Sequence, residues 1–600
     1  MILIVEGYNY KAETAKKILN GFSHKYLKAG VSTDCVGYCY CKSLDDCIFF
    51  APKVICDSTD KVLGKYSPEE CIDLTNSDVT SEEKAFLQEL NVWIYRALQE
   101  YSKLEESSGI LQSQYFSVVD KTGAVTSGTF LDTILALLKF YHDNRDFIIF
   151  TIKSIHSQNH KINWRKTISQ SQSVVQNDVP FYFDPIAKKK TVDWDEELMI
   201  IFFSILEYIK KYGFDIRTDN QYDLIKGDRF SAYIEGLGVR RLRQIRHRYY
   251  SDKTRQLWSL CYAFFETSDT ILSSKEDTDY LVATSFHVAF EAMVDELIGQ
   301  PEFAALRNLE DGKIIDHIYQ DRSLLSDDLV FFIGDSKYYK TRYSVQERSL
   351  SAYKQFTYAR NIVHDSIRHS FKETWPFRDP LTEGYCITPN FFISAEINSD
   401  HRFDLDGFEK DDVEGAHFSS RQFNNRLFDR DTLWVNQYNL NFLYLLSTYA
   451  SADMGVKDAF KQKARHFFRD RTIDLLNKEY EFWELVPKDG KSLEETVQSI
   501  VKWELRGAVY RLGKEGNSLL MAMEKPDEPL NEDDIVNTKY EREYDFYRIK
   551  SIVDSTFIHH RCLLSKEDGK VIQYVSDDTT PSKGHFFFFF FFDNEQVDTQ

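Results

Sequence analysis

Residues 329–340 read Leu329-Val330-Phe331-Phe332-Ile333-Gly334-Asp335-Ser336-Lys337-Tyr338-Tyr339-Lys340, an apolar run that ends in an acid and a lysine. The run predicts a buried β-strand. Because strand side chains alternate, Asp335 and Lys337 are expected on one face and Ser336 on the other. Burying a carboxylate and an ammonium costs on the order of several kcal/mol per ion unless they pair or bind a metal. The stretch therefore predicts either a divalent-metal site with a lysine beside it or a strand that has reached solvent.

The residues before this run predict a partner strand and a helix. A short apolar stretch at 313–319 contains Asp316, and the polar segment 320–328 would close a hairpin that brings Asp316 next to Asp335. Residues 286–298 have helical periodicity and carry Glu291 beside the apolar stripe, and Gly299-Gln300-Pro301 ends the helix. A further helix, predicted at 345–363, contains Gln355.

The order of helix with Glu, strand with Asp, strand with Asp-x-Lys and helix with Gln resembles the PD-(D/E)xK nuclease fold. More narrowly, the chain resembles the McrC-like branch and the LlaJI-type restriction endonucleases, on the stretches 332–340, 425–433 and 437–444. The resemblance is firm over 281–370, looser to about 480, and thin before 240 and after 500. Two features depart from the pattern: Asp316 follows Ile where the fold name expects Pro, and the later helix reads Gln-x-x-Tyr where some branches have Gln-x-x-x-Tyr.

The resemblance implies a catalytic set for phosphodiester hydrolysis in double-stranded DNA. Asp316 and Asp335 would hold Mg²⁺ (or Mn²⁺), with the backbone carbonyl of Ser336 as a further ligand and Glu291 acting directly or through water. Lys337 would orient or help to deprotonate the attacking water, or stabilise charge in the transition state. Gln355 would hold the substrate phosphate or the lysine.

Each of these residues also has a structural alternative. Glu291 can be a solvated helix residue, and Asp316 can cap a turn or pair with His317. Gln355 can be a supporting or surface residue, and we expect His317 to be structural.

The charge of the chain bears on how it would bind DNA. A net charge of −20 is unfavourable for a protein that must neutralise phosphates by itself. One densely cationic stretch, 238–250, contains five arginines that could follow a DNA backbone or form a solvated or acid-paired helix face: Arg240, Arg241, Arg243, Arg246 and Arg248. Lys188-Lys189-Lys190 is expected to lie in a loop.

Composition limits several other functions. No apolar run is long enough to span a membrane, which predicts a cytoplasmic protein. The nine cysteines argue against a disulfide framework. Six of them lie within residues 35–71, where a zinc site is the alternative to reduced, partly buried thiols. Asp489-Gly490-Lys491-Ser492 imitates the end of a phosphate-binding loop, but Leu485 stands where that motif needs glycine.

The length of 600 residues predicts a multidomain α/β protein. We expect a mixed N-terminal domain at 1–190, β-rich and then helical, for DNA or partner binding. A helical connector at 191–280 would lead to a PD-(D/E)xK core at 281–480, a mixed sheet flanked by helices in which 432–450 forms a buried helix. A mostly helical extension at 481–600 would end in a poorly ordered tail that contains the seven phenylalanines Phe586–Phe592.

The resulting hypothesis is a Mg²⁺-dependent endonuclease subunit of a restriction or phage-defence system. The McrC-like resemblance implies a separate AAA+ GTPase or ATPase partner, similar to McrB, because the chain itself has no phosphate-binding loop. The alternatives are a non-catalytic nuclease-fold adaptor that regulates such an NTPase, and an enzyme that acts on RNA or on single-stranded ends.

Overall fold

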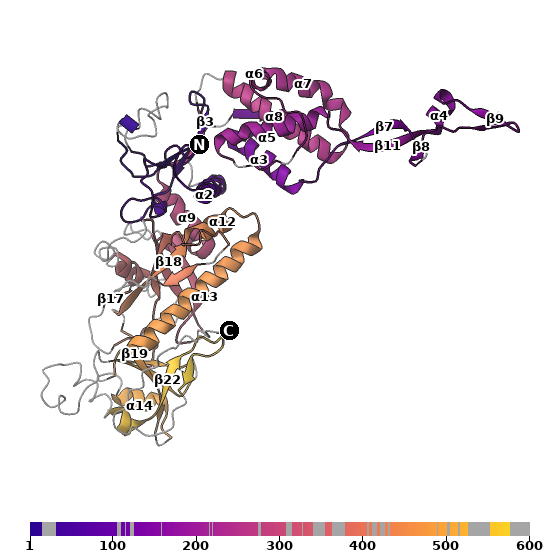
Figure 1. Cartoon of the computed structure of the whole chain (residues 1–600). Coiled ribbons are helices and arrows are strands. Elements are labelled where there is room, and N and C mark those ends of the chain that lie inside the picture. Colours follow the sequence, from indigo (N-terminus) through magenta and orange to yellow (C-terminus); the bar gives the residue numbers. More distant parts are fainter. Residues whose placement is uncertain are drawn as a thin grey trace, which may run out of the picture.

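The computed structural model describes residues 1–11, 13–14, 32–104, 110–114, 116–119, 125–157, 159–214, 216–218, 220–273, 278–307, 315–326, 328–339, 354–362, 378–404, 407–410, 417–420, 426–429, 432–488, 490–500, 505–513, 516–525 and 552–575. These residues form a mixed α/β protein with several sheets, arranged in more than one unit (Figure 1). The multidomain α/β class predicted from the sequence is confirmed. The phenylalanine run lies outside the described residues.

The N-terminal sheet has the strand order β1-β3-β2-β12-β4. Its strands are β1 (Ile2–Val5), β3 (Asp46–Ala51), β2 (Val36–Cys41), β12 (Thr278–Ala283) and β4 (Leu111–Gln114). A separate hairpin joins β5 (Phe116–Val119) to β6 (Val125–Gly128). Strand β12 pairs with β2 and β4. From its end the chain passes directly into a helix of a second unit, described below as the central unit. All nine cysteines are buried free thiols.

Helices surround this sheet and continue into a helical body. Helix α2 (Ser81–Tyr101) begins at a capping box in which Thr80 and Glu83 satisfy each other's backbone amides, and α3 (Phe130–Asp143) begins at the same motif made by Thr129 and Asp132. The body adds α5 (Glu197–Ile209), α6 (Asp228–Ala232), α7 (Gly238–Ile245) and α8 (Asp252–Ser273). Short helical turns at Lys53–Ile55, Lys210–Tyr212, Tyr233–Leu237 and Arg246–Arg248 connect these elements.

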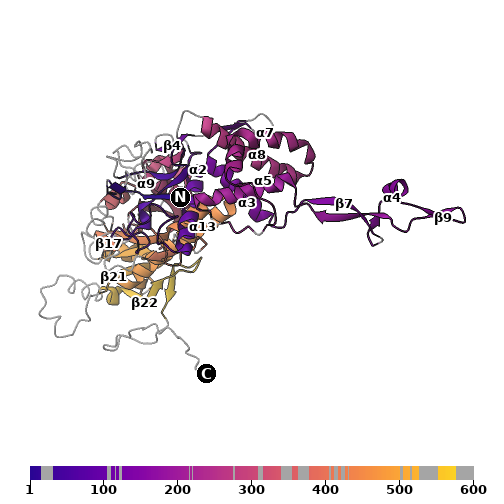
Figure 2. The same cartoon turned by 45° about the horizontal axis from the view of Figure 1, so that its top comes forward.

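A narrow arm projects from the helical body in both views (Figures 1 and 2). Its stem is the antiparallel pair of β7 (Phe150–His156) and β11 (Ile186–Val192), with β8 (Lys161–Ile162) added to β11. The outer part consists of α4 (Trp164–Gln170) and the hairpin of β9 (Val174–Gln176) and β10 (Val179–Phe181). Lys188, Lys189 and Lys190 lie in β11, so the predicted loop is wrong. The strand pairing with β7 fixes them, and strands tolerate consecutive lysines where one or both faces are solvated.

The central unit contains a mixed sheet of order β13-β14-β15-β18-β16, with β17 also paired to β18. The predicted hairpin is confirmed: β13 (His317–Arg322) runs antiparallel to β14 (Leu329–Lys337). Strand β14 is parallel to β15 (Asn390–Glu396), which is parallel to β18 (Leu433–Asn441); β16 (Phe408–Lys410) and β17 (His417–Ser420) are antiparallel to β18.

Helices cover both faces of this sheet. A helix at 354–362 packs on one face through Phe356, Ala359 and Ile362, against Phe331 and Ile333. The other face carries Phe332 and meets α9 (Phe286–Ile298) and α13 (Met454–Glu479). Residues 301–307 form a short turn and α10 (Ala304–Arg307). The predicted helix at 432–450 is only half right, because β18 occupies its first part and α12 (Phe442–Tyr449) the second.

Residues 480–574 form a second five-stranded sheet, so the predicted mostly helical C-terminal part is wrong. Its order is β20-β21-β19-β22-β23, from β19 (Tyr480–Pro487), β20 (Val509–Arg511), β21 (Leu519–Glu524), β22 (Phe557–Leu564) and β23 (Ile572–Tyr574). Helix α14 (Leu493–Ile500) packs on one face of this sheet, and α13 packs against β19 and β22 on the other. Strand β20 lies at one edge of this sheet, where Val509 pairs with Met521 of β21.

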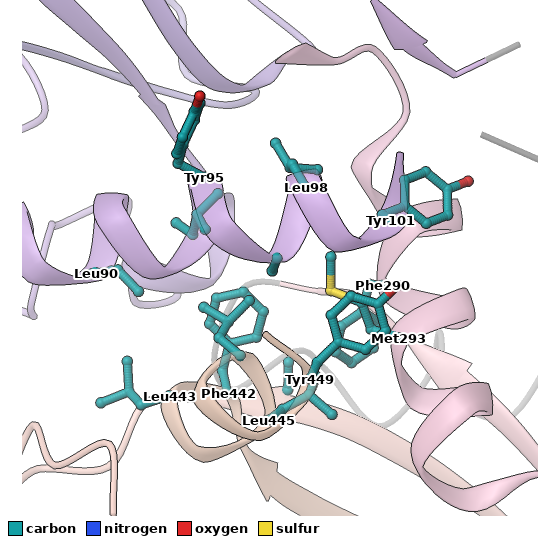
Figure 3. Close-up of a cluster of buried hydrophobic side chains, with 14 of the residues drawn as sticks. Leu90, Tyr95, Leu98, Tyr101, Phe290, Met293, Phe442, Leu443, Leu445 and Tyr449 are labelled. Atoms are coloured by element: carbon teal, nitrogen blue, oxygen red, sulfur yellow. The ribbon is translucent and has the colours of Figure 1, made fainter. Parts of the chain in front are cut away.

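The N-terminal and central units meet through a dry apolar cluster (Figure 3). Helix α2 lies over α9, which contributes Phe290 and Met293, and over α12, which contributes Phe442, Leu443, Leu445 and Tyr449. Leu90 and Tyr101 lie at the two ends of this contact, whereas Tyr95 and Leu98 point to the other side of α2, where Tyr95 contacts Thr129 and Tyr38 of the N-terminal unit. All of these side chains are buried. Burying apolar area of this extent fixes the position of α2 relative to α9, because each buried large side chain contributes roughly 1.5–3 kcal/mol.

No helix among the described residues is long and apolar enough to cross a bilayer.

Candidate active site at the end of β14

The last residues of β14 place Asp335 and Lys337 together. The ammonium of Lys337 forms an ion pair with Asp335 Oδ2, and both side chains are largely buried. Ser336 points to the other face, where its hydroxyl lies 2.6 Å from His317 Nε2. The alternation expected from the sequence is therefore present. The two charges pair at a buried strand end, so they are not simply solvated.

Asp316 lies one residue before β13 and is bonded to the same strand end. Its Oδ2 accepts a hydrogen bond from the Ser336 amide at 2.9 Å. Burial, followed by the nearby Asp335 and Glu291 carboxylates, raises the pKa of Asp316 to about 7, although His317 and the Ser336 amide act in the opposite direction. The alternative in which Asp316 only caps a turn does not account for this concentration of acids.

Glu291 reaches the same place from α9. It is half-buried, and burial together with the Asp335 carboxylate raises the pKa of Glu291 to about 7, against the effect of Lys337. Burial alone would lower the pKa of Lys337, but Asp335 and Asp316 outweigh it, and the pKa lies above its ordinary value. Glu291, Asp316, Asp335 and Lys337 thus form one electrostatic unit, named here the carboxylate cluster.

The carboxylate cluster has an excess of acid. Three carboxyl groups share one ammonium, and burial together with mutual repulsion raises the pKa values of Glu291 and Asp316 to about 7. A hard divalent cation prefers such oxygen donors and would relieve the repulsion, so the donor set fits Mg²⁺ or Mn²⁺. In the part of the chain that the structure describes, no three acid, histidine or cysteine side chains are already drawn together as a metal-ligand group. A cation bound here would compete with Lys337 for the Asp335 carboxylate.

Gln355 contacts the strand rather than the carboxylate cluster. Its Nε2 donates to the carbonyl oxygen of Ile333 at 3.2 Å, and its side chain is buried. Gln355 Oε1 is also buried and has no hydrogen-bond partner among the described residues. The contact supports β14 two residues before Asp335, so Gln355 acts here as a positioning residue.

His317 connects the hairpin to α9. Its Nδ1 lies 3.4 Å from Asp295 Oδ1 while Nε2 faces Ser336, and its side chain is fully buried. These contacts lie on the face of β14 opposite the Asp335–Lys337 pair. The expected structural role agrees with this geometry.

Tyr338, Glu6 and Lys53 form a junction that the sequence did not predict. The Tyr338 hydroxyl donates to Glu6 Oε2, and the Lys53 amide lies 3.2 Å from both that oxygen and the Tyr338 hydroxyl. The ammonium of Lys53 is 4.6 Å from the centroid of the Tyr338 ring. Burial raises the pKa of Glu6 despite these contacts. The sequence does place an acid, Glu6, directly after the apolar strand Ile2–Val5, which is a signal for a buried polar contact. Its partner Tyr338 could not be identified, because it lies more than 330 residues away.

The arginines of the 238–250 stretch mostly have partners inside the protein. Arg241 and Arg248 pair with Glu197, and Arg243 donates to the Tyr262 hydroxyl at 2.7 Å. Arg246 lies over the Trp258 ring at 5.4 Å. The acid-paired alternative therefore describes Arg241 and Arg248, while Arg240 is exposed.

Comparison with protein-family models, with curated proteins and with solved structures gave no match to this chain.

Proposed function

We propose that this protein is a Mg²⁺-dependent DNA endonuclease that acts as the nuclease subunit of a restriction or phage-defence system in the cytoplasm. One observation carries the proposal: Glu291, Asp316, Asp335 and Lys337 come from a helix and a hairpin to one buried strand end, where two carboxyl groups have pKa values of about 7. The order α9, β13, β14, helix 354–362 and β15 supports a PD-(D/E)xK core.

Each side chain of the carboxylate cluster would have a separate role. Asp316 and Asp335 would hold the cation, with Ser336 through its carbonyl and Glu291 directly or through water. A bound divalent cation supplies charge neutralisation at the scissile phosphate and acidifies the attacking water. Lys337, released from Asp335, would donate a hydrogen bond to the phosphate or orient the water, which stabilises charge that develops in the transition state.

The arm supports a protein partner, which we take to be the AAA+ GTPase or ATPase. Two-stranded ribbons are marginal in water by themselves, and this one exposes large apolar side chains, among them Ile152 at 66%, Val175 at 65% and Phe183 at 70%. Residues 150–192 contain seven Lys and Arg (153, 161, 165, 166, 188, 189 and 190) against two acids (178 and 184). An apolar, basic projection is a surface suited to an acidic protein partner.

The competing function is a non-catalytic adaptor that regulates the NTPase. The Asp335–Lys337 ion pair favours the adaptor, because Lys337 occupies the Asp335 carboxylate that would otherwise bind a cation. Retention of all three acids with raised pKa values favours the nuclease, since an adaptor has no use for buried acids that repel one another.

Plasmid cleavage tests the proposal. The wild type would be compared with Asp335→Ala, Lys337→Ala and the exposed control Glu302→Gln, in Mg²⁺ or EDTA, with and without the AAA+ protein encoded beside its gene. We expect Mg²⁺-dependent cleavage by the wild type and the control and a loss of at least a hundredfold in the two site variants. Equal cleavage by all four proteins would refute the site, and no cleavage under any partner condition would favour the adaptor.

A further inference from the structure

An open groove of about 1020 Å³ lies where the helical body meets the central unit. Its walls are the C-terminal halves of α2 and α3, residues 216–217, and Ala450 at the end of α12. Four cationic side chains line it, from three separate segments of the chain: Arg96, Lys139, Arg145 and Arg217. We name this feature the basic groove.

The basic groove has uncompensated positive charge. Four lining cations face two lining acids: Glu100, which pairs with Lys103 at 2.6 Å, and Asp143, which lies 3.7 Å from the exposed ring of His142, so the lining keeps a net positive charge. Within the described ranges, none of the four groove cations forms an ion pair. This contrasts with Arg241 and Arg248, which share Glu197. In a protein of net charge −20, four unpaired cations around one hollow form a local site of attraction for anions.

Local contacts hold the groove in shape. The Tyr141 hydroxyl of α3 donates to the carbonyl oxygen of Arg217 at 3.0 Å, which ties the 216–217 segment to α3. The guanidinium of Arg96 lies 5.1 Å from the Trp93 ring centroid on α2. Leu135, Leu138 and Ile216 supply an apolar floor beneath the charged rim.

The basic groove is fixed relative to the carboxylate cluster. Helix α2, which carries Arg96, packs through its opposite face on α9, which carries Glu291, in the cluster of Figure 3. An anion bound along α2 is therefore held at a constant distance from the proposed catalytic residues.

We propose that the basic groove binds the sugar-phosphate backbone of duplex DNA and so aligns the substrate of the nuclease; this inference rests on the proposed function for its choice of polyanion. Four cations on separate walls match a repeating row of phosphates better than a single small anion, and arginine forms bidentate contacts with phosphate oxygens. The groove supplies DNA contacts that the paired arginines of 240–248 do not.

A binding assay in EDTA tests the inference independently of cleavage. Fluorescence anisotropy with a labelled 30-base-pair duplex would compare the wild type with Lys139→Gln/Arg145→Gln/Arg217→Gln. The matched control is Lys226→Gln/Arg229→Gln/Lys253→Gln, which removes the same charge from exposed sites of the helical body outside the groove.

We expect the groove variant to bind DNA at least tenfold more weakly at about 0.1 M salt. Its plot of log affinity against log salt should flatten by about 0.9 for each phosphate that the variant no longer neutralises, hence by up to about 2.7. The control should change affinity less than twofold. Equal decreases in affinity in both triple variants, no decrease in either, or a wild type that does not bind DNA would overturn the inference.

The outcomes separate the groove from the nuclease. A wild type that binds through the groove but does not cut in Mg²⁺ refutes the proposed function and leaves the groove standing. A groove variant that binds DNA normally but fails to bind the AAA+ protein would assign the groove to a protein partner, and that result also overturns the inference.

Discussion

Replacing Asp335 by asparagine should change stability in opposite directions at low and high pH. Asp335 contributes to the raised pKa values of both Glu291 and Asp316 and also pairs with Lys337. At pH 5 the first two acids are protonated, so the variant mainly loses the ion pair. At pH 8 Glu291 and Asp316 lose their protons, so the variant mainly loses the repulsion that Asp335 exerts on them, and Asp316 remains as a neighbour of Lys337.

The size of the effect follows from the pKa values. In the folded protein Glu291 and Asp316 titrate near 7, against ordinary values of 4.5 and 3.8 that apply to the unfolded chain. Between about pH 4 and 7 the folded state therefore binds more protons than the unfolded state, and the free energy of unfolding falls as pH rises. At about 1.4 kcal/mol per pKa unit, the displacements from 4.5 and from 3.8 to about 7 together lower stability at pH 8 by about 8 kcal/mol. Burial is the larger cause, so relief of the Asp335 charge should recover about 1–2 kcal/mol.

Thermal unfolding at pH 5 and pH 8, in EDTA and in Mg²⁺, measures this directly. At about 2–4 °C per kcal/mol, Asp335→Asn should melt a few degrees above the wild type at pH 8 in EDTA and below it at pH 5. Mg²⁺ should raise the melting temperature of the wild type and of Glu302→Gln but not that of Asp335→Asn. A variant that is destabilised equally at both pH values would refute the reasoning, because the ion pair would then outweigh the repulsion.

Three further predictions test other parts of the structure. Tyr338→Phe removes the hydrogen-bond donor to the buried Glu6 carboxylate, so it should lower the free energy of unfolding by about 1–3 kcal/mol and reduce the cleavage rate more than DNA affinity. Glu6→Gln keeps an oxygen that can accept the Tyr338 hydrogen bond, so it should be less destabilising. Melting curves and single-turnover cleavage rates compare the two variants. Gly334→Ala should destabilise the central unit by about 1–3 kcal/mol, since a Cβ there would lie 2.4 Å from the Phe391 ring; a melting temperature equal to that of the wild type would contradict this packing. Replacing residues 153–189 by a short turn should leave the melting temperature unchanged, because the arm is mostly exposed, yet abolish co-purification with the AAA+ protein; retained binding would show that the arm is not the contact.

The sequence predicted the residues of the carboxylate cluster better than their arrangement. Strand alternation alone places Asp335 and Lys337 on one face. The polar segment at 320–328 between two apolar stretches was sufficient to predict the hairpin of β13 and β14. The same local patterns could not show that Lys337 pairs with Asp335, or that Gln355 donates to the backbone of Ile333, because both depend on side-chain positions set by packing.

The wrong predictions have a common cause. Apolar stretches such as 433–441 are compatible with either a helix or a strand by composition. This stretch forms the strand β18 because it pairs with β15, which is far away in the sequence. Residues 480–525 became a sheet for the same reason, since Leu485 pairs with Leu519 across 34 residues of sequence. Likewise, Glu197 neutralises Arg241 from 44 residues away, which no local charge count can reveal.

Manganese binding followed by electron paramagnetic resonance shows whether the carboxylate cluster holds a divalent cation, and it needs neither substrate nor partner. We predict saturable Mn²⁺ binding at pH 8 by the wild type and by Glu302→Gln, weakening below pH 7 as Glu291 and Asp316 take up protons, with Mg²⁺ competing for the site. Asp316→Asn and Asp335→Asn should bind at least tenfold more weakly. Equal Mn²⁺ binding by all four proteins, or none by the wild type, would contradict the account.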